Sequence, residues 1–558
     1  MNHQSNYPGS VTVTERRWLI LFGTIVMLIT TIPYVIGYAN QGEDWRFTGF
    51  ILGVEDGNSY IAKMLIGASG GWLFRTPYTA SAQRGVVAFL PYILLGKLAQ
   101  GPGIHEQLVA LYHIFRLVAG LLMIFVTYDF IALLCRSIRI RRLGLILATL
   151  GGGLGWVLLL FGQTQRNGDL PLEFYSPETF GFLSLFGIPH LALARATFLW
   201  AIIGYVRQVL MPGEKWWLPS TTIGVFWLLT YFVQPISAVV LGLLFGLHLL
   251  VTGVWQIGRW LTHKGIEWRA WLNLFRVIGV AVLITGPYLV YYAFAYATDP
   301  FLKSWSAQNI LRSPPPLYYL LAFGLIFPFA LYGVYKLVKE MPWAGLFFIS
   351  WIVAFPVLAY APITVQRRLP EGIWVALITL GMYAVERWEG DRERYTLLNR
   401  VANKQVLLGA WVVLSLPSAL FLIIGGILAV ITPATPIFRP SDETKAFEQF
   451  TQIAQSGDIV LASFDTGNAI PAWAPIRVMI GHGPESIGAT QLEPGIMSFF
   501  EGENTIENKV KFLKDHRIAF VFWGPEEKEI GAWYPGSLEM LVPRYKDGVY
   551  EIFQVEGP

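Results

Sequence analysis

The sequence predicts an α-helical polytopic membrane protein with about eleven spans and a small C-terminal α/β domain on the extracytoplasmic side. Of its 558 residues, 54% are hydrophobic and 14% charged, and the mean hydropathy is +0.50. These values are too apolar for an ordinary soluble protein. Residues 440–558 contain 18 acidic and 9 basic side chains, whereas residues 1–439 contain 19 acidic and 32 basic ones. A basic membrane part and an acidic tail indicate two compartments rather than a nucleic-acid-binding surface.

The spans follow from hydrophobic runs and from the basic residues between them. The first run lacks a small-residue cleavage site, so we expect it to be a span and not a removed signal peptide. With the N-terminus in the cytoplasm, the basic run RSIRIRR at 136–142 lies inside, as the positive-inside rule requires. The acidic tail then lies outside. The predicted spans are 18–38, 107–135, 143–162, 191–210, 219–234, 236–256, 273–296, 317–337, 343–361, 372–386 and 405–431.

Two segments decide how the spans are counted. VVAFLPYILLGKL (86–98) has only 13 residues and contains Pro91, whereas a span needs about 20 residues. We predict an interfacial or re-entrant helix there, within a long first outer loop at 39–106. The runs on either side of Gln234-Pro235 form two spans or one kinked helix, because proline breaks the helical hydrogen-bond pattern.

The tail is predicted to be a soluble α/β domain over 433–558, after a transmembrane domain over 1–432. SDETKAFEQFTQIAQ and KVKFLKDH have helical patterns, and each precedes a strand-like run, GDIVLASF or IAFVFWG; GVYEIFQV ends the chain as a strand. The turn-rich segment at 465–486 lacks a phosphate-binding glycine motif and is predicted to be a connection. His482 within it binds an acceptor or docks the domain. Cys135 is the only cysteine, which excludes a disulfide framework and a thiolate metal cluster.

The segment GVEDGNSYIAKM (53–64) in the first outer loop carries the most informative polar residues. A helix that begins after Asp56 places Tyr60 and Lys63 on the face that continues from Asp56. We therefore predict an amphipathic helix in the membrane interface, with Asp56 available for chemistry or serving as the helix N-cap. The opposite, apolar face consists of Ile61, Met64, Leu65 and Ala68.

This layout resembles the GT-C superfamily of polyprenyl-phosphate-sugar glycosyltransferases. That superfamily includes protein O-mannosyltransferases, lipid A aminoarabinose transferases and the catalytic subunits of oligosaccharyltransferases. The family pattern Asp-Glu-x-x-Tyr is kept here at Asp56 and Tyr60, with Gly57 in place of the glutamate and a second acid at Glu55. The strings DGNSYIAKM, PETFGFLSLFGIPH and QRRLPEG are similar to those of bacterial GT-C-type proteins that have no defined substrate.

The resemblance implies roles for several residues. Transfer of a sugar from a lipid phosphate needs a base for the acceptor hydroxyl and cations for the departing phosphate. The resemblance favours an inverting reaction with Asp56 as base, and Glu55 is the alternative base. Arg367 and Arg368 are candidates for the phosphate, although paired arginines at the end of a span also extend toward lipid head groups without specificity.

Substrate binding is also predicted for Tyr60, Lys63, Arg75 and Arg84, for which a solvated surface position is the alternative. Glu178 and His190, in the second outer loop, are further candidates, and their alternatives are a place in the first turn of a helix and a structural role. We expect no metal ion, although Asp56, Glu178 and His190 could converge on one, as acids of these two loops do in oligosaccharyltransferases. Arg195 and Gln234 are expected to face the interior of the bundle, because polar residues within spans do so.

The predicted function is transfer of a sugar from a polyprenyl phosphate to a glycan, lipid or protein acceptor at the outer face of a bacterial inner membrane. A mannosyltransferase-like role in the cell envelope fits this prediction. A transporter or flippase is the first alternative, but the sequence shows no inverted repeat and few ionisable residues inside spans. A lipid-binding member of the fold without catalytic activity is the second.

Overall fold

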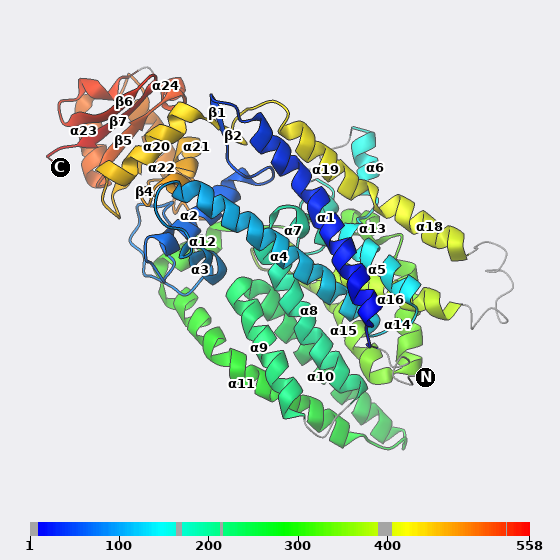
Figure 1. The fold of residues 1–558 in the computed structure, drawn as a ribbon. Helices are drawn as coiled ribbons and strands as arrows, with labels where there is room; N and C mark the ends of the chain where they lie inside the picture. Colours follow the sequence, from blue (N-terminus) through cyan, green and yellow to red (C-terminus); the bar gives the residue numbers. More distant parts are fainter. Residues whose placement is uncertain (1–8, 163–169, 212–215, 389–403, 532, 558) are drawn as a thin grey trace. The chain divides into compact units, whose positions relative to one another are not determined.

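The computed structural model describes residues 9–162, 170–211, 216–388, 404–531 and 533–557, and its fold is largely helical (Figure 1). Within these ranges, eight helices or helix pairs are long and apolar enough to cross a membrane. A ninth candidate is the pair α13 (Pro316–Phe323) and α14 (Phe327–Glu340), which is bent by 74°. Six of the eight are single helices: α1 (Val13–Asn40), α4 (Ile104–Ala132), α8 (Pro189–Leu210), α10 (Pro235–Leu261), α11 (Trp268–Thr298) and α15 (Pro342–Ala359). The seventh, Gln366–Arg387, comprises η3 (Gln366–Arg368) and α16 (Ile373–Arg387). The eighth, Gln405–Ala429, comprises α18 (Lys404–Ser415) and α19 (Pro417–Ala429).

Two predicted stretches of the chain contain a break between helices: the span at 143–162 and the runs on either side of Gln234. The prediction of a continuous span at 143–162 is wrong: α5 (Ile138–Leu150) ends before three consecutive glycines, and α6 (Gly155–Leu160) follows them. Glycine weakens a helix interior, and a Cβ at Gly153 would lie 2.4 Å from the Cα of Ala322. The runs around Gln234 form two helices, α9 (Trp217–Val233) and α10, because Gln234 is extended before Pro235 (φ −149°, ψ 92°).

The segment at 86–98 contains only a short helix, α3 (Leu90–Gly96). Seven helical residues extend about 10 Å, which is far less than the thickness of a bilayer core. This confirms that the segment is not a helical span.

The chain divides into two compact units. The first contains residues 1–31, 115–292 and 310–425, and the second contains residues 32–114, 293–309 and 426–558. The second unit thus combines the first outer loop with the C-terminal residues. Independent folding of 433–558, as the predicted domain boundary implies, stays a prediction.

The second unit is built on a five-stranded sheet with the strand order β4-β3-β5-β7-β6. The central strand β5 (Phe520–Trp523) is parallel to β3 (Ile459–Leu461) and antiparallel to β7 (Tyr550–Val555). β4 (Arg477–Val478) is parallel to β3, and β6 (Leu541–Asp547) is antiparallel to β7. This confirms the predicted α/β character and the three predicted strands.

The first loop joins the C-terminal residues through a second, two-stranded sheet. β1 (Trp45–Phe47) pairs antiparallel with β2 (Phe438–Pro440), and Trp45 lies opposite Pro440. The remaining helices of the second unit are α2 (Val54–Ala68), α12 (Pro300–Gln308), α20 (Ser441–Ile453), α21 (Phe464–Trp473), α22 (Ala489–Phe500), α23 (Ile506–Asp515), α24 (Pro525–Ile530) and η5 (Pro535–Ser537). The prediction that 465–486 is a connection is wrong in its first half, where α21 lies.

In the first unit, a large apolar core surrounds α8, most of whose residues are buried, and α16, whose residues are almost all buried. η2 (Leu172–Phe174) and α7 (Gly181–Gly187) precede α8. The segment between them carries Glu178, and the segment between α15 and α16 carries Arg367 and Arg368.

Candidate functional site

Helix α2 begins at Val54, two residues before Asp56. Gly53 is the N-cap in the left-handed conformation (φ 58°), and no side chain caps the helix. Asp56 is therefore the third helical residue, and the alternative that it is the N-cap is wrong. Its carboxylate nevertheless lies in the first turn, where the helix dipole favours a negative charge.

Helix α2 is buried on most of its surface. The prediction of an interfacial amphipathic helix with Lys63 on a polar face is wrong, because the side chain of Lys63 is only 2% exposed. The backbone of α2 touches that of α3: a Cβ at Gly67 would lie 1.9 Å from the carbonyl oxygen of Ile93, and one at Gly96 would lie 1.7 Å from that of Met64. Glycine at both positions permits this close contact.

A buried ion pair joins α2 to the loop that follows β4. The Lys63 Nζ donates to Glu485 Oε1 at 2.6 Å, and the Glu485 side chain is 4% exposed. The same oxygen accepts from Ser59 Oγ at 2.9 Å, and Oε2 accepts from Thr76 Oγ1 at 2.5 Å. Lys63 also donates to Ser59 Oγ. The ammonium of Lys63 thus donates two hydrogen bonds inside the protein.

The same loop contacts both carboxylates at the start of α2. The Nε2 of His482 lies 3.3 Å from Asp56 Oδ1, and the backbone N–H of Gly483 donates to Glu55 Oε1 at 2.6 Å. The Asp56 side chain is 63% exposed, whereas that of His482 is 6% exposed. Asp56 therefore faces solvent with a buried imidazole behind it.

The charges in this site change the pKa values of its buried groups. Burial alone would lower the pKa of His482, but the carboxylates of Glu485 and Asp56 outweigh burial and raise it above the ordinary value. Burial would raise the pKa of Glu485, but Lys63 and His482 lower it overall. Lys63, Glu485, His482 and Asp56 thus form a series in which basic and acidic side chains alternate.

Packing explains the departure from the family pattern at Gly57. A Cβ at this position would lie 2.3 Å from the ring of Phe50, so the ring occupies the space that a glutamate side chain would need. Tyr60 is half-buried, and its ring stacks on Tyr92 at 4.8 Å and on Tyr112 at 6.0 Å. Tyr60 therefore lies in an aromatic stack beside the site.

Several residues of this site were missed by the sequence predictions. Asn468 on α21 accepts from Asn58 at 2.7 Å and donates to the carbonyl of Glu55 at 3.3 Å. Ser486 Oγ accepts the backbone N–H groups of Gly481 and His482 at 2.9 Å each. The cluster of polar residues in GHGPES was the available signal, but its partners are more than 400 residues away in the sequence.

The first unit contains a second polar cluster. Glu178 is buried, and its Oε1 lies 3.3 Å from Arg368 Nε, in an ion pair without hydrogen-bond geometry. Arg195 donates to Glu371 Oε1 at 2.5 Å and to the carbonyls of Pro177 and Glu178. The guanidinium of Arg367 lies 4.7 Å from the ring centre of Tyr175.

This cluster brings together several predicted residues. Arg368 and Glu178 meet as an ion pair, and Arg195 is buried as expected. Gln234 is also buried, and His190 is half-buried as the second residue of α8. Asp56 and Glu55 belong to the other unit.

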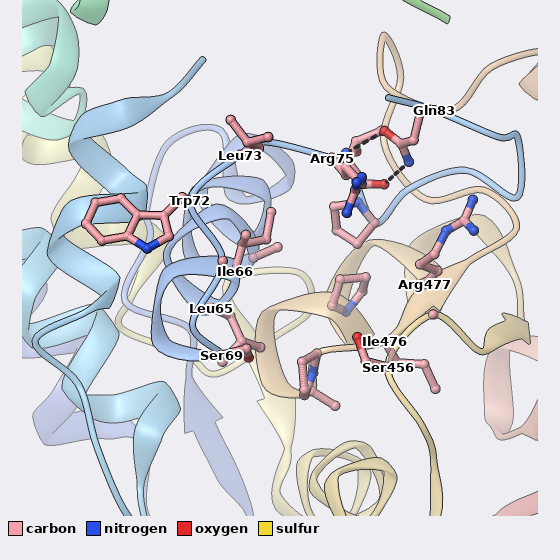
Figure 2. A pocket seen from close by; sticks show the side chains of 18 of the residues that line it. Leu65, Ile66, Ser69, Trp72, Leu73, Arg75, Gln83, Ser456, Ile476 and Arg477 are labelled. Atoms are coloured by element: carbon pink, nitrogen blue, oxygen red, sulfur yellow. Dashed lines mark hydrogen bonds between the residues drawn. The ribbon is translucent and has the colours of Figure 1, made fainter. Parts of the chain in front are cut away.

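The predicted cations Arg75 and Arg84 are both exposed in the first outer loop. Arg75 lines a cavity of about 750 Å³ within the second unit (Figure 2). Arg84 is not among the residues that line it.

The described residues offer poor ligands for a metal ion. Within either unit, no three histidine, cysteine or acidic side chains are grouped so that they could hold one. The neighbour of Asp56 is a histidine with a raised pKa, and the neighbour of Glu178 is an arginine. Asp56 and Glu178 belong to different units and each has a basic side chain as its neighbour, and the absence of a metal stays a prediction.

Comparisons with solved structures identify the fold. The oligosaccharyltransferase of Archaeoglobus fulgidus in its apo form matches over 92% of this chain and 70% of its own length, with a TM-score of 0.50 and 14% identity. The chain has the GT-C fold. The same enzyme tethered to an acceptor peptide that contains the NVT sequon matches over 90% and 69%, also with a TM-score of 0.50 and 14% identity. No family model and no curated protein sequence matches the chain.

The GT-C fold was predicted from the resemblance, and the structural match confirms it. At 14% identity the likeness establishes the fold alone. Within a shared fold, activity depends on the residues of the site.

Replacement of one partner of the buried ion pair tests how strongly it holds the second unit together. We expect Lys63→Met to lower the free energy of unfolding by about 3–5 kcal/mol. In this variant the carboxylate of Glu485 would stay buried, and His482 would be the basic side chain left beside it. Lys63→Met combined with Glu485→Gln should recover part of this loss. Chemical denaturation of the purified protein in detergent measures the change.

Lys303→Met, at an exposed lysine of α12, is the matched control and should change stability little. Wild-type stability in the Lys63→Met variant would contradict a structural role for the pair.

Proposed function

We propose that the chain is a glycosyltransferase that transfers a sugar from a lipid-phosphate donor to an acceptor on the extracytoplasmic side, with Asp56 as the base. The observation that carries this proposal is an exposed Asp56 carboxylate held by His482 at 3.3 Å, in a chain with the GT-C fold. Solved neighbours of this fold are oligosaccharyltransferases, one of them tethered to an acceptor peptide. The sugar, the lipid and the acceptor of this chain are part of the proposal.

The proposed reaction is a single inverting displacement. The acceptor hydroxyl gives its proton to Asp56 while its oxygen attacks the anomeric carbon of the sugar. The bond between that carbon and the phosphate oxygen breaks, and the electron pair leaves with the lipid phosphate. One carboxylate suffices for this step, whereas a double displacement would need a carboxylate as nucleophile.

Asp56 suits the role of base better than Glu55. Glu55 accepts the N–H of Gly483 at 2.6 Å, a charge-assisted bond that occupies one of its oxygens and fixes the loop. Both carboxylates are exposed, but the partner of Asp56 is the buried imidazole of His482, which can exchange a proton. We assign Glu55 to the support of the loop and Asp56 to proton transfer.

Within the first unit, we propose that Arg367 and Arg368 bind the phosphate of a lipid. A guanidinium can bind two phosphate oxygens at once. The Arg368 side chain is 31% exposed, so a ligand can reach it.

Substitution of the base tests the proposal directly. We expect Asp56→Asn to lower the rate of transfer from radiolabelled polyprenyl-phosphate sugars by at least about 100-fold, since the amide cannot accept the proton. Transfer is measured with the purified chain across a panel of donors and acceptors. Asp44→Asn, at another exposed aspartate of the first loop, should leave the rate unchanged.

Equal transfer by wild type and Asp56→Asn would eliminate Asp56 as the base. If wild type transfers no sugar from any donor of the panel, a lipid-binding role without catalysis replaces the proposal.

The pH dependence of the reaction tests the role of His482. Although burial opposes it, Glu485 and Asp56 raise the pKa of His482, so its ring keeps a proton to higher pH than an ordinary imidazole does, and the protonated ring favours the ionised form of Asp56. We expect His482→Gln, which removes the charge, to move the acid limb of the kcat/KM profile to higher pH. A profile measured between pH 4 and 8 that coincides with wild type would refute this electrostatic role.

The proposed orientation places the second unit outside the cell. A cysteine at exposed Ser537 should react with a membrane-impermeant maleimide added to intact cells. The natural Cys135 is buried and gives a low background. Labelling that requires permeabilised cells would place this unit in the cytoplasm and would contradict the orientation.

A further inference from the structure

The cavity of about 750 Å³ in the second unit lies beside Leu65 and Ile66 of α2 (Figure 2). Leu65 and Ile66 line it from the second half of the helix, and Ser69 lines it from the C-cap. Leu65 is nine residues after Asp56, which places it about 13 Å along the axis and roughly half a turn around it. The site of Asp56 and His482 and this cavity are thus separate features of one unit.

The walls of the cavity combine an apolar surface with positive charge. Trp72 and Leu73 are exposed at its edge, and Pro471 and Ile476 contribute from the region of α21 and β4. Two arginines, Arg75 and Arg477, are among the described residues that line it, and none of those residues is acidic. A volume of this size accommodates a small organic ligand such as a phosphorylated sugar or a lipid head group.

The two arginines are placed differently. Arg477 donates from Nε to the carbonyl of Thr79 at 3.1 Å and from Nη2 to that of Ser81 at 2.8 Å, so its plane is fixed at the wall. Arg75 is exposed, and no ion pair of Arg75 is found in the part of the chain that the structure describes. One guanidinium is therefore fixed, and the other is available to a ligand.

The backbone around Arg75 is held in place. The side chain of Gln83 accepts from the N–H of Thr76 at 2.8 Å and donates to its carbonyl at 2.7 Å (Figure 2). The Thr76 hydroxyl bonds Glu485, so the wall of the cavity is tied to the buried ion pair. A cationic wall on a fixed backbone is preorganised for an anion.

We propose that this cavity binds a phosphate group, carried by a soluble molecule or by a lipid, through Arg75 and Arg477. Arginine matches the geometry of phosphate oxygens, and the absence of acids among the described lining residues removes the repulsion that an anion would meet. The apolar part of the wall contacts the body of the ligand. This proposal is independent of the proposed sugar transfer.

Binding to the purified full-length chain tests the proposal. Inorganic phosphate and a hexose 1-phosphate are titrated by calorimetry, and retention of phosphatidylglycerol is measured by native mass spectrometry. We expect Arg75→Gln to weaken binding of at least one of these probes about tenfold or more, and Arg75→Lys to weaken it less. Arg84→Gln is the matched control, an exposed arginine of the same segment outside the cavity, and should bind as wild type does.

Loss of binding for the soluble probes in Arg75→Gln supports the cavity as a site for soluble phosphates. Loss for phosphatidylglycerol alone supports a lipid head group as the ligand. No binding of any probe, or equal binding by Arg75→Gln and Arg84→Gln, would overturn the proposal. Because the measurement is binding, its failure is distinct from failure of the transfer assay.

Discussion

The ion pair between Lys63 and Glu485 is the interaction on which the proposed site depends. Two charges buried in this way are stable only if both are paired and hydrogen-bonded, and removal of either leaves the other unpaired. Glu485 meets this demand with bonds from Lys63, Ser59 and Thr76. The geometry fixes the loop after β4 on α2, although the two segments are more than 400 residues apart in the sequence.

The positions of His482 and Gly483 follow from that attachment. Both residues lie within three positions of Glu485, so the loop brings an imidazole to Asp56 and a backbone N–H to Glu55. Two adjacent carboxylates thereby acquire different partners. Asp56 is paired with a titratable imidazole, which is an arrangement suited to a base that must stay ionised.

The sequence predicted the membrane class, the α/β tail and the GT-C fold, because hydropathy, periodicity and the Asp-x-x-x-Tyr pattern are local signals. It did not predict that Lys63 is buried, because helical spacing places a charge on a face without revealing what covers that face. The glycine at 57 had no explanation in sequence terms, since the ring of Phe50 that occupies the space is a tertiary contact. The interruption after Leu150 was missed because apolar residues on both sides of three glycines gave a continuous hydrophobic run.

A double-mutant cycle on sugar transfer tests most directly whether Asp56 and His482 act as one unit. The rates of wild type, Asp56→Asn, His482→Gln and the double variant are compared with the same donor and acceptor. If His482 acts only through the charge and position of Asp56, the double variant transfers as slowly as Asp56→Asn and no slower. Losses that multiply in the double variant would show that the two residues act separately and would contradict this account.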